Sequence, residues 1–495
     1  MRKYLPIIGV LALIKFIIHA FGNRNYGFHR DELLHLSVSE HLDWGYFEFP
    51  PFIALIGKIS YLLFDYSLFG VRLFPTLAGI AILYLCCVMA KEMGGKSKAI
   101  LLAGVSVLAF LPFYRNHTLF QPVAFDQLFW TLGFFFLVKY IKTENYKFLL
   151  LMGATGGLGL MNKYTMLVWG FGIAVGLIFY KKAELYKSKW LYLSVLLALL
   201  IFLPNILWQL SYDIPFLLHL EVLKTKQLDA INPFDFGFSQ LDYIFTLAVS
   251  LIGLSAMFFD TELKKYKSVG ISFLVIFFTM WILQSKAYYF FAAYPIVFAA
   301  GAVKIEQLLS SKPKWNYAVV AVLIIPVIPY IPQLTPILPI ESYVEYTGKP
   351  LVDGRVELTG DYADMFGWEE QVALVDSLYQ EYCLDETTKC VIWAENYGEA
   401  GAIKILGDKY GLPDPISRHG SFWLWGYQNK EANLWISIGN ETGSVNSVFE
   451  ETELVTRIYH KYAIGEENGI PVYLCRNPKV DIEQWWKDYE KKVFD

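Results

Sequence analysis

The sequence predicts a polytopic α-helical membrane protein that ends in a small extracytoplasmic α/β domain. Of the 495 residues, 55% are hydrophobic and only 18% are charged, whereas an average globular chain is about 25% charged. Long apolar runs fill the chain up to residue 335, and Lys and Arg gather in alternate breaks between them. The net charge of −4 offers no basic surface for nucleic acid, and the 5 cysteines are too few for a disulfide scaffold.

The apolar runs are long enough to cross a bilayer. A span needs about 20 mostly apolar residues to cross about 30 Å of hydrocarbon. We expect eleven spans, at 4–21, 69–90, 99–114, 122–140, 147–161, 164–180, 190–209, 241–259, 268–284, 287–303 and 316–334. The apolar stretch 50–66 starts at a Pro-Pro pair and is interrupted by Lys58 and Asp65, so we expect a helix at the membrane interface.

The basic residues predict the orientation. Alternate breaks are basic, at Arg2 and Lys3, then around 91–98, 139–147, 181–189, 264–267 and 304–314. The positive-inside rule places these breaks and the N-terminus in the cytoplasm. The loops 22–68, 115–121, 210–240 and 285–287 are then extracytoplasmic, together with everything after residue 335.

The chain changes character near residue 335. Residues 1–335 form the predicted transmembrane module and 336–495 the predicted α/β domain, joined through a proline-rich junction. In the second part KCVIWA, ANLWISIG and GIPVYLC indicate strands, and EAGAIKILGDKYG indicates a helix with a glycine stop. Cys383 and Cys390 are seven residues apart on the oxidising side. A disulfide between them is compatible with the sequence but not required by it.

The first extracytoplasmic loop concentrates ionisable residues. Its segment 23–52 reads NRNYGFHRDELLHLSVSEHLDWGYFEFPPF, and the apolar positions of 31–42 fit a helix lying on the membrane surface. The carboxylates lie among aromatic residues, an environment that raises a carboxyl pKa toward the range of a general base. Pro50 and Pro51 fix the backbone directly after Glu48. The alternative is an ordinary loop with its charges in water.

Three further polar segments lie at the outer ends of spans. Asp126 lies a few residues inside an apolar run, where an ionisable side chain is costly. Lys163 and Lys286 are either snorkelling residues or ligands for an anionic lipid head group. The candidates in these segments are Arg115, His117, Asp126, Lys163, Lys286, Tyr288 and Tyr289. Cations and carboxylates on one face suggest a site for proton transfer beside a phosphate.

These motifs resemble those of a known family. HRDEL, GYFEFPP, NKYT and SKAYYFFAAYP, in that order, resemble the GT-C membrane glycosyltransferases of the protein O-mannosyltransferase type and their bacterial relatives, which include lipid A aminoarabinose transferases. AENYGEAGAIKILG and SFWLWGY resemble the C-terminal region of those relatives. The resemblance implies a GT-C fold in the inner membrane of a bacterium, with the active site on the periplasmic face.

The resemblance also implies a reaction. Such enzymes move a hexosyl or pentosyl group from a polyprenyl-phosphate donor to a hydroxyl of a glycolipid, glycan or protein, generally with inversion. Asp31 matches the catalytic acid and is the expected base, Glu32 is its neighbour, and Glu48 matches the second acidic position. Relatives carry His or Lys where this chain has Phe49. The donor phosphate would then be bound by Arg30, Arg115, Lys163 and Lys286, with Tyr288 and Tyr289 beside them.

Other interpretations stay open. No metal is expected, although His29, Asp31, His35 and Glu48 carry groups that suit zinc or manganese. A secondary transporter or lipid flippase is the alternative function. Transporters tend to show repeated halves and ionisable residues at mid-depth, whereas here no internal repeat is found and the ionisable residues gather at the outer ends of spans. The sugar and the acceptor are not determined by the sequence.

Overall fold

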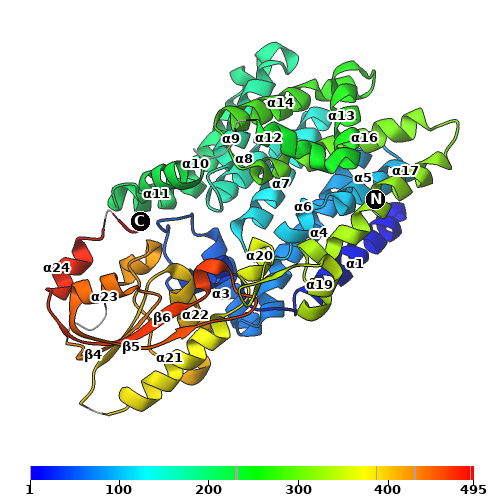
Figure 1. Ribbon diagram of the computed structural model, residues 1–495. Helices are drawn as coiled ribbons and strands as arrows, with labels where there is room; N and C mark the ends of the chain where they lie inside the picture. Colours follow the sequence, from blue (N-terminus) through cyan, green and yellow to red (C-terminus); the bar gives the residue numbers. More distant parts are fainter. Residues whose placement is uncertain are drawn as a thin grey trace.

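A computed structural model describes residues 2–228, 232, 234–385, 387–427, 431–490 and 492–494. A long helical body carries a small sheet domain at one end, as Figure 1 shows. The sheet domain, coloured yellow to red, lies beside helix α3 (Phe52–Phe64), coloured blue. The predicted class, a polytopic helical protein with a small C-terminal α/β domain, is confirmed.

Among the described residues, the helical body has eight helical stretches that are long and apolar enough to cross a membrane. They are Arg2–Gly22, Leu68–Glu92, Pro122–Thr143, Lys189–Ser211, Asp235–Phe259, Leu263–Ile282, Ala287–Leu308 and Trp315–Leu334. The other three expected spans, 99–114, 147–161 and 164–180, hold the shorter helices α5 (Ser97–Ala109), α8 (Lys147–Leu160) and α9 (Met166–Ile178). At 13 or 14 residues, each reaches only about 20 Å. The predicted run 147–161 matches α8 within one residue, whereas the runs 99–114 and 164–180 continue beyond α5 and α9 into turns.

The long stretches contain helices whose individual bounds differ from the predicted runs by a few residues. They are α1 (Leu5–Gly22), α4 (Leu68–Glu92), α7 (Pro122–Thr143), α10 (Lys189–Ser211), α13 (Ile244–Phe259), α14 (Lys267–Ile282), α16 (Tyr294–Leu308) and α17 (Trp315–Ile324). Shorter connecting helices are α6 (Pro112–Asn116), α11 (Pro215–Leu223), α12 (Asp235–Phe238), α15 (Ala287–Phe290), α18 (Ile331–Leu334), α19 (Ile340–Thr347) and α20 (Gly360–Ala363).

The first loop folds into two helices, α2 (Arg30–Glu40) and α3 (Phe52–Phe64), as expected for both segments. The surface position predicted for the first of them is wrong. Residues 32–39 of α2 are all buried, because α3 packs on one side of it and α22 of the sheet domain on another. An apolar stripe facing lipid is indistinguishable in sequence from one facing a second domain. This packing brings the acidic loop and the sheet domain together.

The sheet domain contains a four-stranded mixed sheet in the order β3-β4-β6-β5. The three predicted strands are β3 (Cys390–Ala394), β4 (Leu434–Ile438) and β6 (Ile470–Pro478), with β3 parallel to β4 and β6 antiparallel to it. The fourth, β5 (Phe449–Ile458), was not predicted, since its exposed edge carries acidic side chains. Its helices are α21 (Trp368–Tyr382), α22 (Tyr397–Leu406), α23 (Thr442–Val448) and α24 (Ile482–Lys487), beside a two-stranded β1 (Leu351–Val352) and β2 (Arg355–Val356).

Two local features of this domain follow from the sequence. The predicted helix EAGAIKILGDKYG is α22, and the Asn396 side chain caps it by accepting from the backbone N–H groups of Gly398 and Glu399. The disulfide that the sequence left open is present between Cys383 and Cys390, whose Cα atoms are 5.8 Å apart. It ties the C-terminal end of α21 to the start of β3.

Candidate active site

Asp31 lies in the first turn of α2, and two distant parts of the chain hold its carboxylate. The Tyr397 hydroxyl, at the start of α22, donates to Oδ1 at 3.0 Å. Gln121 Nε2 donates to Oδ2 at 2.8 Å. Each carboxylate oxygen can accept a second hydrogen bond, and Asp31 stays partly exposed. The carboxylate is therefore held in one orientation and still has capacity to accept a proton.

The electrostatics around Asp31 correct one expectation. Burial alone would raise the pKa of Asp31, but the positive charge of His29, the Tyr397 hydrogen bond and Arg115 oppose burial, so the pKa lies below its ordinary value. The prediction that aromatic surroundings raise this pKa is wrong for Asp31, because polar and cationic groups surround its carboxylate. Asp31 is consequently ionised at neutral pH, as a proton acceptor must be.

Glu32, the adjacent acid, has a different environment. It forms an ion pair with Arg72 in which both side chains are 0% exposed. Oε1 accepts from Arg72 Nε at 3.0 Å and the Phe120 N–H at 2.8 Å, while Oε2 accepts from Arg72 Nη2 at 2.8 Å and the His29 N–H at 2.9 Å. These four bonds use the acceptor capacity of the carboxylate. Glu32 therefore fixes the start of α2 and presents no open oxygen to a substrate.

Glu48 contacts the sheet domain. Its two oxygens accept hydrogen bonds from the backbone N–H of Ser421 at 2.8 Å and from the Ser421 hydroxyl at 2.5 Å. Burial raises the pKa of Glu48, against the opposing effect of these bonds. Gly420 lies so close that a Cβ there would be 1.8 Å from Glu48 Oε1. The raised pKa predicted for the acids of this loop thus applies to Glu48.

The arginines expected at the phosphate are paired with carboxylates of the sheet domain. Arg30 Nη2 lies 2.7 Å from Asp364 Oδ1, and Arg115 Nη2 lies 2.6 Å from Asp361 Oδ1. Arg115 Nη1 also donates to Gln121 Oε1 at 2.7 Å, which orients the amide that binds Asp31. Figure 1 places α20, which precedes Asp364, at the junction of the helical body and the sheet domain. Both guanidinium groups are therefore already neutralised.

His29 belongs to the same group of ion pairs. Its Nε2 lies 3.6 Å from Asp361 Oδ1 and 3.7 Å from Asp364 Oδ2, while Nδ1 accepts the N–H of Asp31 at 3.1 Å. Burial would lower the pKa of His29, but the hydrogen bond with Asp361 and the nearby carboxylates raise it. His29 therefore caps α2 and adds positive charge beside Asp31.

A second group of predicted residues gathers around Lys163. Lys163 Nζ lies 4.0 Å from the centre of the Tyr289 ring and 5.7 Å from that of Tyr288. Asp126 accepts a hydrogen bond from Thr165 at 2.8 Å and is within electrostatic range of Lys163. Tyr288 is in turn within electrostatic range of Arg115, as Asp31 is. Tyr288 therefore links the Lys163 group to the Asp31 group.

Lys286 lies near the same group. His219, in α11, has its pKa lowered to about 4 by burial and by the charge of Lys286. The His219 ring lies tilted against Phe494, close to the end of the chain, with ring centres 4.8 Å apart, and the rings of His419 and Tyr397 lie 5.0 Å apart. In Figure 1 this end of the chain lies beside α11. Neither histidine was a predicted site residue.

One predicted residue falls outside the site. His117 Nε2 lies 3.0 Å from Gln127 Oε1 within the helical body, and His117 is 0% exposed. Its neighbours include His19, at a ring distance of 6.5 Å, and the buried Lys15. The prediction of His117 as a site residue is wrong in placement, since the turn after α6 directs its side chain into the bundle.

The possible metal site is not assembled. Among the described residues, no group of three or more His, Cys, Asp and Glu side chains is arranged to hold a metal ion. His29 faces Asp361 and Asp364, Glu48 faces Ser421, and His35 Nδ1 donates to the Phe120 carbonyl at 3.1 Å. The four candidate ligands thus point to different partners.

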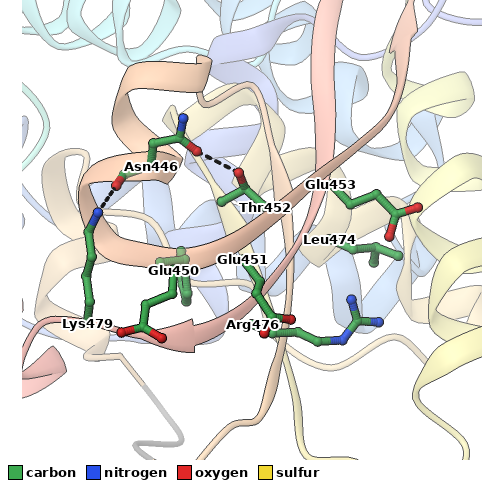
Figure 2. A pocket seen from close by; sticks show the side chains of 9 residues that line it. Asn446, Glu450, Glu451, Thr452, Glu453, Leu474, Arg476 and Lys479 are labelled. Carbon is green, nitrogen blue, oxygen red and sulfur yellow. Dashed lines mark hydrogen bonds between the residues drawn. The ribbon is translucent and has the colours of Figure 1, made fainter.

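A surface hollow elsewhere offers no comparable chemistry. It has a volume of about 640 Å³ and is lined along β5 and β6, as Figure 2 shows. In that view Asn446 accepts a hydrogen bond from Thr452 through its side chain and one from Lys479 through its backbone. None of the predicted site residues lines it. The candidate site is therefore the region around Asp31 and Lys163.

Known proteins resemble the chain in part of its sequence and in its fold. The family described as "Dolichyl-phosphate-mannose-protein mannosyltransferase" matches residues 48–208. The crystal structure of ArnT from Cupriavidus metallidurans bound to undecaprenyl phosphate is similar over 95% of this chain and 98% of that one, with a TM-score of 0.64 and 11% identity. The apo structure of the same ArnT gives 94% and 97% coverage, a TM-score of 0.63 and 12% identity. No curated protein sequence matches the chain significantly.

These findings define the class of protein. The fold is that of the GT-C membrane glycosyltransferases. The segment that matches the mannosyltransferase family, residues 48–208, contains Glu48 and Lys163. The fold similarity and the family match over residues 48–208 agree with the resemblance to GT-C membrane glycosyltransferases that the motifs predicted.

Proposed function

We propose that the chain transfers a hexosyl or pentosyl group from a polyprenyl-phosphate donor to a hydroxyl of a glycolipid, glycan or protein. The proposed site faces the extracytoplasmic side of a bacterial inner membrane. The observation that carries the proposal is the ionised Asp31 carboxylate, which Tyr397 and Gln121 hold in place. Arg115, which is within electrostatic range of Asp31, is also within range of Tyr288 beside Lys163. The similar fold of an ArnT that binds undecaprenyl phosphate supports a lipid-linked donor.

The proposed reaction requires a base and a cation. Asp31 accepts the proton of the acceptor hydroxyl while the hydroxyl oxygen attacks the anomeric carbon of the donor sugar. The bond between that carbon and the phosphate oxygen breaks, and the polyprenyl phosphate leaves with the electron pair. Attack from the side opposite the phosphate inverts the configuration at that carbon. Positive charge near the leaving oxygen lowers the barrier, and Lys163 and Lys286 supply it on the side of Tyr288 and Tyr289.

Two features support the proposed orientation. The Cys383–Cys390 disulfide is typical of a domain that matures in an oxidising compartment. The Lys-rich breaks lie on the other side of the helical body by the positive-inside rule. Both features support a location of the sheet domain and Asp31 outside the cytoplasm.

The test is to identify the donor directly. The protein is purified in mild detergent, co-purified lipids are analysed by mass spectrometry, and sugar release is assayed with a panel of synthetic undecaprenyl-phosphate sugars. We expect a polyprenyl-phosphate sugar among the lipids and transfer from one member of the panel. Movement of a lipid-linked sugar across proteoliposomes without cleavage of its phosphate bond would contradict the proposal and favour a flippase.

A further inference from the structure

The active-site carboxylate depends on a residue of the sheet domain. Asp31 and Tyr397 are 366 positions apart, and the Tyr397 hydroxyl donates to Asp31 Oδ1 at 3.0 Å. Gln121 donates to the other oxygen, Oδ2. Rotation of the carboxylate about its Cβ–Cγ bond would therefore disrupt these two hydrogen bonds. Removing either donor therefore frees the carboxylate to turn.

The local fold holds Tyr397 firmly in place. It is the first residue of α22, directly after the capping Asn396. Next to it, Gly398 packs on Arg30, and a Cβ at Gly398 would lie 2.6 Å from Arg30 Cγ. One turn later Gly401 packs on Leu33 of α2 in the same way, with a Cβ position 2.9 Å from Leu33 Cβ. The two helices can meet this closely only because both positions are glycine, and this contact sets the height of Tyr397 beside Asp31.

The Tyr397 hydroxyl is a donor throughout the working pH range. Burial and the neighbouring Asp31 charge raise the pKa of Tyr397 well above its ordinary value, so the phenol keeps its proton. A hydrogen bond donated to a carboxylate favours the ionised form. The other charged or titratable groups around Asp31 are His29, His35, Arg115, Asp364 and Tyr288.

We propose that Tyr397 is a positioning residue of the transferase, which orients the Asp31 carboxylate toward the acceptor hydroxyl and keeps it ionised. The inference rests on the proposed function. It makes the sheet domain a structural part of the active site, since α22 contributes the hydroxyl that the helical body lacks at this point. Tyr397 itself touches neither donor nor acceptor in this role.

The test compares Tyr397→Phe with wild type across pH. Phe keeps the ring that packs 5.0 Å from His419 and removes only the hydroxyl. We expect kcat to fall about 10- to 100-fold, the usual range for losing a partner that orients a reactive group, with KM for the donor unchanged. The acidic limb of the pH profile should move to higher pH, because the pKa of Asp31 rises when a donor to its ionised form is lost. Tyr459→Phe, at an exposed tyrosine, is the matched control.

Two further measurements separate positioning from a general loss of structure. In an Asp31→Asn background, Tyr397→Phe should cause no additional loss, because its effect passes through Asp31. Replacing Tyr397 with 3-fluorotyrosine, a stronger donor of similar shape, should move the acidic limb to lower pH. The inference would be overturned if the acidic limb of the pH profile stays unchanged in both Tyr397 variants. It would also be overturned if the losses in kcat from Asp31→Asn and Tyr397→Phe add up in the double variant, while the wild type still transfers sugar. Absence of transfer by wild type would instead overturn the proposed function.

Discussion

The part of the candidate site around Asp31 (the Asp31 side) and the part around Lys163 (the Lys163 side) differ in whether their cations are paired with carboxylates. On the Asp31 side, Arg30, Arg115 and Arg72 each form an ion pair with a carboxylate. On the Lys163 side, the ammonium group lies over the Tyr289 ring, and in the part of the chain that the structure describes it joins no carboxylate within 4.0 Å. A cation that already has a carboxylate partner has little attraction left for a phosphate, whereas a cation over an aromatic ring keeps most of it.

The difference indicates that the two groups of cations have different roles. The paired arginines hold the sheet domain against α2 and so fix Asp31 and Tyr397. Lys163, which lies over Tyr289 and near Tyr288, is suited to meet an incoming anion. In sequence the arginines and lysines looked like equivalent phosphate ligands, and their partners distinguish them.

Asp31→Asn should have the largest effect on activity. Asn keeps the volume and the contacts of the side chain but cannot accept the proton, so turnover should fall by about 10² to 10⁴. Donor binding should be retained, because the Lys163 side is untouched. Sugar transfer and donor binding are measured in nanodiscs, with Asp65→Asn in the same loop as the control. Normal transfer by Asp31→Asn would assign the base to another carboxylate.

Glu32→Gln should act on stability. It leaves Arg72 buried with a neutral partner, and breaking a buried pair costs about 3–5 kcal/mol. Denaturation in detergent measures the loss, and Arg72→Gln in the same background should restore part of it. If the Glu32→Gln variant has wild-type stability and is inactive, the structural role assigned to Glu32 is wrong, and Glu32 acts on the substrate.

Lys163→Ala should weaken use of the anionic donor. Removing one cation from the leaving phosphate costs about 10- to 1000-fold in turnover, and Lys286→Ala should act in the same direction. Lys181→Ala, at an exposed lysine paired with Glu144, is the control. Arg30→Gln should lower stability more than donor use. Wild-type kinetics in Lys163→Ala, combined with a loss of donor binding in Arg30→Gln, would show that the paired cations bind the phosphate.

Much of the fold was predictable because it depends on local patterns. Hydropathy located the helical body, three short apolar segments indicated β3, β4 and β6, and a helical segment with a glycine stop indicated α22. The lengths of the short helices α5 and α9 were overestimated, since a turn inside an apolar run leaves no mark on hydropathy. The surface helix α2 was misplaced for a similar reason, because its apolar face packs on protein.

The site was predictable only in part. Asp31 and Glu48 were selected from motifs in one loop, and the structure places both beside the sheet domain. Asp361, Asp364 and Tyr397 were missed, because their partners lie more than 240 positions away and no local pattern indicates the pairing. The distinct environments of Asp31 and Glu32 likewise depend on Arg72, 40 positions after Glu32.

The contact between Glu48 and Gly420 has a consequence for the order of synthesis. Glu48 and Ser421 are 373 positions apart, and Asp31 and Tyr397 are 366 apart. While the ribosome is still translating the helical body, the two acids have been made but their partners do not yet exist. A nascent chain inserted in the membrane therefore has an unfinished catalytic centre until the sheet domain emerges and docks. If the proposed function holds, activity requires that synthesis of the sheet domain is complete.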